Sequence, residues 1–153
     1  MRKENALLVA LDQVQDPRNL GAVCRSAEAA GAVGLVIPDR RSAEVTPTAC
    51  KTSAGAVEHL PIARVRNLAD WLTEAKQANF WIWGADADAS QAPWDTDLTG
   101  PTVLVLGGEG KGLRPRVAAS CDGSVALPQQ GRTASLNVSA AAAALLFEAV
   151  RQR

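Results

Sequence analysis

The chain has 153 residues, 47% of them hydrophobic, and its 16 basic and 16 acidic side chains give a formal net charge of zero. This length and composition predict a single domain, residues 1–153, with a substantial core. They exclude a membrane-spanning protein, because no run approaches the roughly 20 apolar residues that cross a bilayer.

The cysteines and the histidine give no sign of a metal site. The chain has three cysteines, Cys24, Cys50 and Cys121, and no two of them have CxxC spacing. The single histidine, His59, has no neighbours of the types that bind metals. We interpret the cysteines as reduced packing residues. We therefore expect a cytoplasmic protein that binds neither a metal nor a membrane.

Apolar runs alternate with segments of helical periodicity along the chain. Short apolar runs predict buried strands at residues 6–11, 33–37, 62–65, 80–83, 102–106 and 123–127. Helical spacing predicts helices at residues 19–31, 47–57, 67–78, 114–120 and 137–151, the first capped by Asn19 and stopped by Gly31. Residues 12–18 are predicted to form a polar loop. The alternation predicts the α/β class, a mostly parallel sheet with helices on both faces.

The charges are distributed unevenly. Residues 1–66 carry nine basic and seven acidic side chains, residues 67–100 carry one and six, and residues 101–153 carry six and three. The two outer segments can therefore form a local basic face that binds phosphate groups. An ordinary solvated surface explains the same distribution equally well.

A glycine-rich turn, residues 107–112, follows the strand predicted at 102–106. It is not a P-loop, because Val105 and Gly112 stand where a glycine and a serine or threonine are required. A GxGxxG pattern also fails, because Leu113 or Pro115 replaces its third glycine. What remains is a turn whose backbone can approach a ligand closely, with Glu109 at its centre. Taken alone, it is more simply an ordinary tight turn.

Three separated segments carry a more specific signal: residues 11–27, 104–113 and 127–141. The first contains the pattern Asp-Pro-x-Asn-x-Gly-x-x-x-Arg from Asp16 to Arg25. In this order and spacing, the three segments resemble the three motifs of the SpoU/TrmH family of RNA ribose 2′-O-methyltransferases, in the SPOUT superfamily. The resemblance covers nearly the whole chain. Residues 146–153 further resemble the branch that methylates a guanosine ribose in large-subunit ribosomal RNA.

This resemblance implies properties that the periodicity does not show. The family fold draws the last third of the chain through a loop into a deep trefoil knot, an exception to the near-absence of knots. The family uses S-adenosyl-L-methionine and forms homodimers through the knot region. RNA is the implied partner, ribosomal RNA first and transfer RNA as an alternative. Relatives of this branch often carry a small RNA-binding domain before the first motif, so the resemblance is to the catalytic domain alone.

The resemblance also assigns roles to individual residues. Arg25 is expected to act on the ribose; because a guanidinium stays protonated, we expect it to bind the adjacent phosphate and stabilise the developing alkoxide. Asn19 is expected beside the reactive ribose, with Glu109, Ser135 and Asn137 in supporting roles. The cofactor contacts are expected at Leu106, Gly107, Gly110, Leu127, Pro128 and Leu136. Candidate phosphate contacts are Arg18, Arg40, Arg41, Lys51, Arg114 and Arg132.

The four tryptophans are candidates for stacking on bases. However, Trp71 lies on an apolar helix face and Trp81 and Trp83 lie in a predicted strand, so we expect at least three of Trp71, Trp81, Trp83 and Trp94 in the core. Two other interpretations stay open. One is a non-catalytic knotted RNA-binding or dimerisation module, against which the family's polar residues argue. The other is an unrelated α/β nucleotide-binding protein, which the failed fingerprints weaken.

Overall fold

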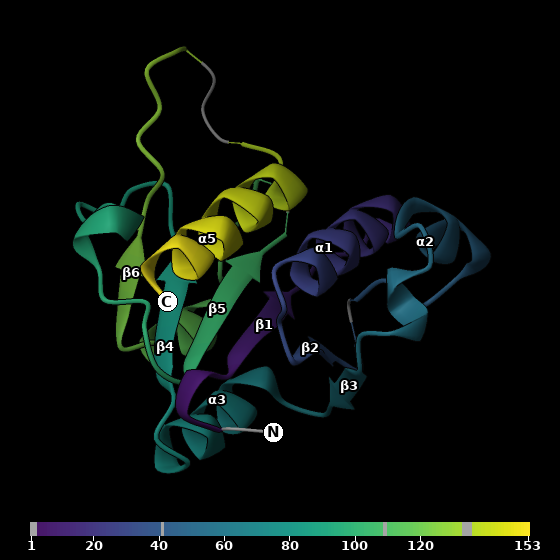
Figure 1. Ribbon diagram of the computed structural model, residues 1–153, viewed down its shortest axis with the longest axis horizontal. Helices are drawn as coiled ribbons and strands as arrows, with labels where there is room; N and C mark the ends of the chain where they lie inside the picture. Colours follow the sequence, from purple (N-terminus) through teal and green to yellow (C-terminus); the bar gives the residue numbers. More distant parts are fainter. Residues whose placement is uncertain (1–2, 41, 109, 133–135) are drawn as a thin grey trace.

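Six parallel strands form one sheet at the centre of the molecule (Figure 1). The computed structural model describes residues 3–40, 42–108, 110–132 and 136–153. The strand order is β3-β2-β1-β5-β4-β6, and every pairing between these strands is parallel. The strands are β1 (Leu7–Asp12), β2 (Gly34–Pro38), β3 (Ile62–Val65), β4 (Trp81–Ala85), β5 (Thr102–Gly107) and β6 (Gly123–Val125). The predicted parallel α/β sheet is confirmed.

Helices cover both faces of this sheet. They are α1 (Pro17–Ala29), α2 (Pro47–Thr52), α3 (Leu68–Gln77), α4 (Pro115–Ala119) and α5 (Val138–Gln152), with short 3-10 turns η1 (Lys3–Asn5), η2 (Ala56–Glu58) and η3 (Pro93–Asp95). Figure 1 shows α1 and α5 side by side over one face, with α3 on the other. The fold therefore has three layers.

Alternation along β1 builds the two halves of the core. Leu7, Val9 and Leu11 pack with α1 and α5, whereas Ala10 packs on the other face with α3 and α4. These side chains are almost completely buried, as expected for a central strand with helices on both sides. Because the sheet is parallel, the loops after β1, β4, β5 and β6 all leave from the same edge, where α/β proteins usually bind their ligands.

Helix α1 begins earlier than its sequence predicts. Asp16 is the N-cap, its carboxylate accepting the Arg18 N–H at 2.8 Å, and Pro17 occupies the first helical position. Proline suits this position because its missing N–H would have no partner in the helix. The prediction of Asn19 as the cap is therefore wrong, since Asn19 lies inside the first turn. The predicted stop at Gly31 is confirmed by its φ of 77° after the C-cap.

The helix predicted at residues 47–57 is interrupted. Helix α2 ends at Thr52, and the turn η2 starts only at Ala56. Between them Ala54 and Gly55 have φ values of 54° and 87°, a left-handed conformation that no right-handed helix continues through. The composition of this segment favoured a longer helix, but these two residues divide it.

Two of the four tryptophans lie at the surface. Trp81 is 57% exposed and Trp94 is 54% exposed, so the expectation of at least three core tryptophans is wrong. Trp81 is the first residue of β4, whereas β6 pairs only from Trp83 onwards. Trp94 lies in η3, a surface turn. Apolar residue type alone did not distinguish the end of a strand from its covered middle.

None of the helices within the described ranges combines the length and the apolar character needed to span a membrane.

Candidate functional site

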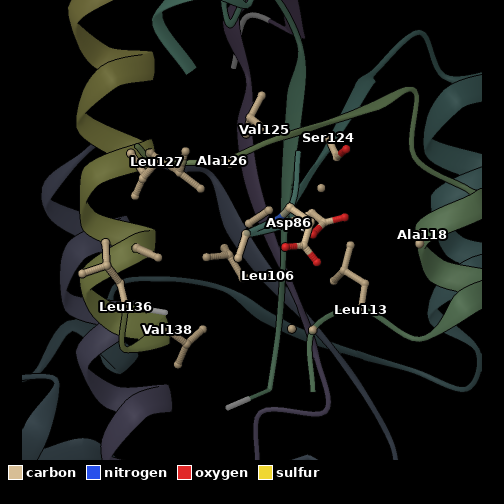
Figure 2. A pocket seen from close by; sticks show the side chains of 18 of the residues that line it. Asp86, Leu106, Leu113, Ala118, Ser124, Val125, Ala126, Leu127, Leu136 and Val138 are labelled. Atoms are coloured by element: carbon tan, nitrogen blue, oxygen red, sulfur yellow. Dashed lines mark hydrogen bonds between the residues drawn. The ribbon is translucent and has the colours of Figure 1, made fainter. Parts of the chain in front are cut away.

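A cavity of about 660 Å³ opens at the carboxyl ends of β4, β5 and β6, beside α5 (Figure 2). Its lining comes from segments far apart in the sequence. These are residues 84–88, 106–108, 110–113, 118, 121, 123–127 and 129, and residues 136, 138, 141 and 145 at the start and along α5. This volume falls within the range of about 300–1,000 Å³ that suits a small-molecule ligand.

The walls of the cavity are apolar on two sides. Figure 2 shows Leu106, Leu127 and Leu136 grouped near α5, with Leu113 on the opposite side. The Asp86 carboxylate points into the space between them. Leu136 is 46% exposed, which leaves an apolar surface for a ligand to cover. The cavity thus suits a ligand with a flat apolar part and polar or cationic groups.

The loop after β5 presents main chain to the cavity because glycines line the cavity there. A Cβ atom at Gly107 would lie 2.2 Å from the Gly112 oxygen, and one at Gly108 would lie 2.4 Å from the Gln13 oxygen. Gly108 and Gly112 also form an antiparallel bridge that closes the loop. Glycine is therefore required at both positions, and a ligand meets backbone groups at this wall.

An ion pair with a buried carboxylate anchors the end of this loop. The Asp12 side chain, at the end of β1, is 0% exposed. One of its oxygens accepts the Arg114 backbone N–H at 2.8 Å, and the other lies 2.8 Å from Arg114 Nε and 2.7 Å from Nη2. The sequence placed Asp12 in a polar loop, and this was wrong: it is the last strand residue and its charge is fully paired.

A second long-range contact joins the first and third motifs. Asn137 is the N-cap of α5, its side-chain oxygen accepting the Ser139 N–H at 2.8 Å. Its amide nitrogen donates to the side-chain oxygen of Asn19 at 3.3 Å. Asn19 therefore contributes to a link between α1 and α5 instead of capping α1.

Cys121 also lines the cavity. Burial raises the pKa of its thiol to about 11, against the weaker lowering effect of Lys76. The thiol lies 3.4 Å from the Val117 oxygen, to which it donates a hydrogen bond. A thiol in this setting stays protonated near neutral pH, which excludes it as a nucleophile there.

Most of the residues expected at the cofactor line this cavity. They are Leu106, Gly107, Gly110, Leu127 and Leu136. Pro128 instead lines an adjoining hollow of about 400 Å³. The sequence had singled out neither Asp86 nor Asp88, which line the cavity just after β4. The rule that ligands bind beyond the carboxyl ends of parallel strands was the signal that could have found them.

The expected catalytic and phosphate-binding residues lie outside the cavity lining or outside the described ranges. Arg25 is an exposed residue of α1 and does not line the cavity. Arg18, Arg40, Lys51 and Arg132 are exposed, whereas Arg114 is engaged with Asp12. Three of the expected residues, Arg41, Glu109 and Ser135, lie outside the residues that the structure describes.

A model of the SpoU rRNA Methylase family matches residues 6–147. The chain belongs to this family. The match includes the loop after β5 and most of α5, which together form much of the cavity wall. The segments that resemble the second and third SpoU motifs therefore form part of the cavity wall, and residues 84–88, 118, 121, 123–126 and 145 complete it.

Known methyltransferases are similar in sequence to this chain over almost its whole length. The chain is 44% identical over 152 residues to a putative TrmH family tRNA/rRNA methyltransferase of Bacillus subtilis, covering 99% of this chain and 61% of the relative. It is 49% identical over 148 residues to the 23S rRNA (guanosine-2′-O-)-methyltransferase RlmB of Xanthomonas campestris, covering 97% and 59%. The chain thus spans about three fifths of the length of these relatives.

Solved SpoU structures have the same fold. The SpoU methyltransferase AviRb from Streptomyces viridochromogenes, in complex with the cofactor AdoMet, superimposes with a TM-score of 0.90 and 37% sequence identity. This similarity covers 99% of this chain and 62% of AviRb. An AdoMet-bound rRNA methyltransferase from Sinorhizobium meliloti also gives a TM-score of 0.90, at 34% identity.

Proposed function

We propose that this chain transfers a methyl group from S-adenosylmethionine to a ribose 2′-hydroxyl of RNA. The observation that carries the proposal is the cavity at the carboxyl ends of β4, β5 and β6, with its leucine walls and its glycine backbone. The AdoMet complex of AviRb supports this choice of cofactor. The names of the RlmB relatives favour a guanosine of 23S ribosomal RNA as the target. A transfer RNA ribose is the second candidate, because the Bacillus relative is named for both RNAs.

The residues of the cavity fit this cofactor. Leu106, Leu127 and Leu136 offer apolar surface to the two sides of an adenine ring. Gly107, Gly108 and Gly110 line the cavity without side chains, so a ligand can form hydrogen bonds with the main chain there. Asp86 supplies negative charge to a cofactor that carries a sulfonium and an ammonium group. When bound, S-adenosylmethionine supplies the electrophilic methyl group.

The ribose is expected to be bound and polarised by residues of the first and third motifs. Arg25 binds the phosphate next to the target ribose and stabilises negative charge that develops on its 2′-oxygen. Asn19 and Asn137 orient the ribose from the junction of α1 and α5, which their hydrogen bond supports. Glu109 and Ser135 are proposed to take supporting roles in the same loops. Reaction requires the two reacting atoms to be held roughly 3–3.5 Å apart, so positioning is the main task of these residues.

Exposed basic side chains are proposed to hold the RNA backbone. Arg18, Arg40, Lys51 and Arg132 are exposed and carry no sequence preference in such a role. Arg41 is proposed for the same role. With contacts to the cofactor and to RNA phosphates, the enzyme selects its target ribose by position, so its specificity arises from the shape of the RNA.

We further infer a homodimer and a trefoil-knotted chain, working in the cytoplasm on ribosomal RNA. The exposed apolar side chains of Trp94, Phe147 and Val150, at η3 and on α5, support a subunit interface there. Ala140 and Ala144 are also exposed on α5 and permit close approach of a partner helix. The position of Arg25 outside the cavity lining supports a site completed by the Arg25 of a second subunit.

Two measurements test the proposed function. Calorimetric titration should show saturable binding of S-adenosylmethionine, and absence of binding would favour a non-catalytic RNA-binding module. Incubation with labelled cofactor and purified ribosomal RNA should then label a single ribose, identified by mapping of alkali-resistant linkages. Label in transfer RNA and none in ribosomal RNA would favour the second candidate.

A further inference from the structure

The Asp12–Arg114 pair occupies an unusual position for an ion pair. Asp12 is completely buried, although isolated carboxylates are very rarely buried because they lose their hydration. Both of its oxygens are used by Arg114, one by the backbone N–H at 2.8 Å and the other by Nε at 2.8 Å. The two residues are 102 positions apart in the chain. A two-pronged, charge-assisted contact of this kind fixes orientation as well as distance.

The segment that this pair closes is the glycine-rich loop of the cavity. The loop leaves β5 at Gly107, which lies directly opposite Asp12 in the pairing of β1 with β5. It ends at Leu113, immediately before Arg114. Asp12 therefore fixes both ends of the loop, the first through the sheet and the second through its carboxylate.

Within the described part of the loop, its own contacts are the Gly108–Gly112 bridge and the hydrogen bond that the Lys111 N–H donates to the Gly108 carbonyl. Its glycines contribute no side-chain packing, and Gly110 and Gly112 have φ values of 70° and 65°, so this segment loses much conformational entropy when it is ordered. Gly107, Gly108, Gly110 and Leu113 all line the cavity, whereas Asp12 does not. A change at Asp12 or Arg114 must therefore reach the cavity through the loop.

We propose that Asp12 and Arg114 are positioning residues that hold residues 107–108 and 110–113 of this loop in their cofactor-binding arrangement. This inference rests on the proposed use of S-adenosylmethionine. It gives Arg114 a task in cofactor binding in place of the phosphate contact expected from its sequence. If loss of the anchor leaves about one tenth of the molecules with a competent loop, the apparent Kd rises about tenfold.

Arg116 provides a matched control. It lies in α4, two residues after Arg114, the N-cap of that helix, and pairs with Asp70 at 3.3 Å, but both side chains are largely exposed, at 72% and 68%. Exposed pairs contribute little to a fold because water and salt screen them. Arg116→Ala thus removes an arginine and an ion pair from α4 without touching the loop.

The test is calorimetric titration of S-adenosylmethionine into the unsubstituted chain and into Arg114→Ala, Arg114→Lys, Asp12→Asn and Arg116→Ala. Arg114→Ala should raise the Kd about tenfold at unchanged stoichiometry, and Arg116→Ala should leave it within about twofold. Arg114→Lys keeps the charge and the backbone N–H bond to Asp12 but loses the Nε and Nη2 contacts, so it should fold and give an intermediate Kd. Binding of total ribosomal RNA should stay within about twofold in every variant.

The outcomes separate this inference from the proposed function. If the unsubstituted chain bound no cofactor, the proposed function and this inference would both be overturned. If it bound and Arg114→Ala bound equally well, only the positioning role would be overturned. A reduced stoichiometry with unchanged Kd would show that the pair merely stabilises the fold, and a selective loss of RNA binding would return Arg114 to a phosphate contact.

Discussion

The side-chain amide of Asn137 donates a hydrogen bond to that of Asn19, 118 residues earlier in the chain. The same Asn137 side chain caps α5 through its oxygen. One residue thus fixes both the start of α5 and its contact with the first turn of α1. The two tasks can be separated by substitution, because they use different atoms.

Asn137→Ser should keep the cap and lose the link to Asn19. Serine caps helices about as well as asparagine, so the free energy of unfolding should change by less than about 0.5 kcal/mol, whereas Asn137→Ala should cost about 1 kcal/mol. If the link orients the ribose, both variants should lower kcat about tenfold. Chemical denaturation and methylation rates measure the two effects. Full activity in Asn137→Ser would show that Asn137 only caps α5 and does not orient the ribose.

Arg25→Ala should abolish methyl transfer without weakening the binding of the cofactor. Arg25 does not line the cavity of its own chain, so the Kd for S-adenosylmethionine should stay within about threefold while the rate falls about 100-fold or more. Titration calorimetry and single-turnover methylation provide the two numbers. A parallel fall of affinity and rate would contradict the assignment of Arg25 to the ribose.

Gly107→Trp should have the opposite effect. A Cβ at this position would already lie 2.2 Å from the Gly112 oxygen, so any side chain displaces the loop backbone. Such overpacking costs about 1–3 kcal/mol of stability, and cofactor binding should be lost at temperatures where the chain remains folded. Circular dichroism checks the fold and calorimetry checks the binding. Normal affinity would remove this loop from the site.

Mixing these two inactive variants tests whether the site is shared between subunits. In a mixed dimer of Arg25→Ala and Gly107→Trp, one site combines an intact arginine with an intact cavity, so about half of the wild-type activity per dimer should return. Subunit exchange is followed by fluorescence energy transfer between labelled chains. Exchange without recovered activity would mean that each subunit uses its own Arg25, and a monomer by light scattering would exclude the dimer.

The raised pKa values of two thiols predict that the free energy of unfolding falls in alkaline solution. Burial, with a smaller effect of Cys50, raises the pKa of Cys24 from 9.0 to about 11, and burial raises that of Cys121 from 9.0 to about 11. As the pH rises, the two thiols therefore lose their protons in the unfolded chain before they do so in the folded chain. Their contribution to the stability of the fold is intact below pH 9.0 and is lost as the pH rises to about 11.

Denaturant midpoints measured across this pH range should fall, and replacing Cys24 and Cys121 together by alanine should flatten the dependence. Cys50 is exposed, so Cys50→Ala should retain most of the slope. A thiol reagent at neutral pH should modify Cys50 quickly and Cys24 only on unfolding. Rapid modification of Cys24 in the folded protein would contradict its burial.

The sheet and its strand type could be predicted because burial leaves a direct trace in the sequence. The apolar run at residues 6–11 and that at 102–106 became β1 and β5 with small shifts at their ends. The glycines at residues 107–112 could likewise be read from the sequence, and they indicated a turn in which backbone segments approach closely. These features depend on residue type and spacing alone.

The long-range polar contacts could not be predicted in the same way. Asp12 resembles any polar residue after a strand, and only the fold brings Arg114 to it. Asn19 is a good capping residue by type, but Asp16 with Pro17 made a better helix start three positions earlier. Asp86 became a cavity residue only because β4 lies beside β5 and β6. Each of these depends on which strands are neighbours.

Strand β1 remains an open edge while most of the chain is being synthesised. It pairs with β2, which follows at residues 34–38, but its other neighbour, β5, arrives only at residues 102–107. At roughly 5–20 residues per second, that side of β1 waits roughly 5–20 s on the ribosome. An unpaired strand carrying Leu7, Val9 and Leu11 is a template for association with other nascent chains. The yield of folded protein should therefore depend on chaperone supply during translation more than on the stability of the finished fold.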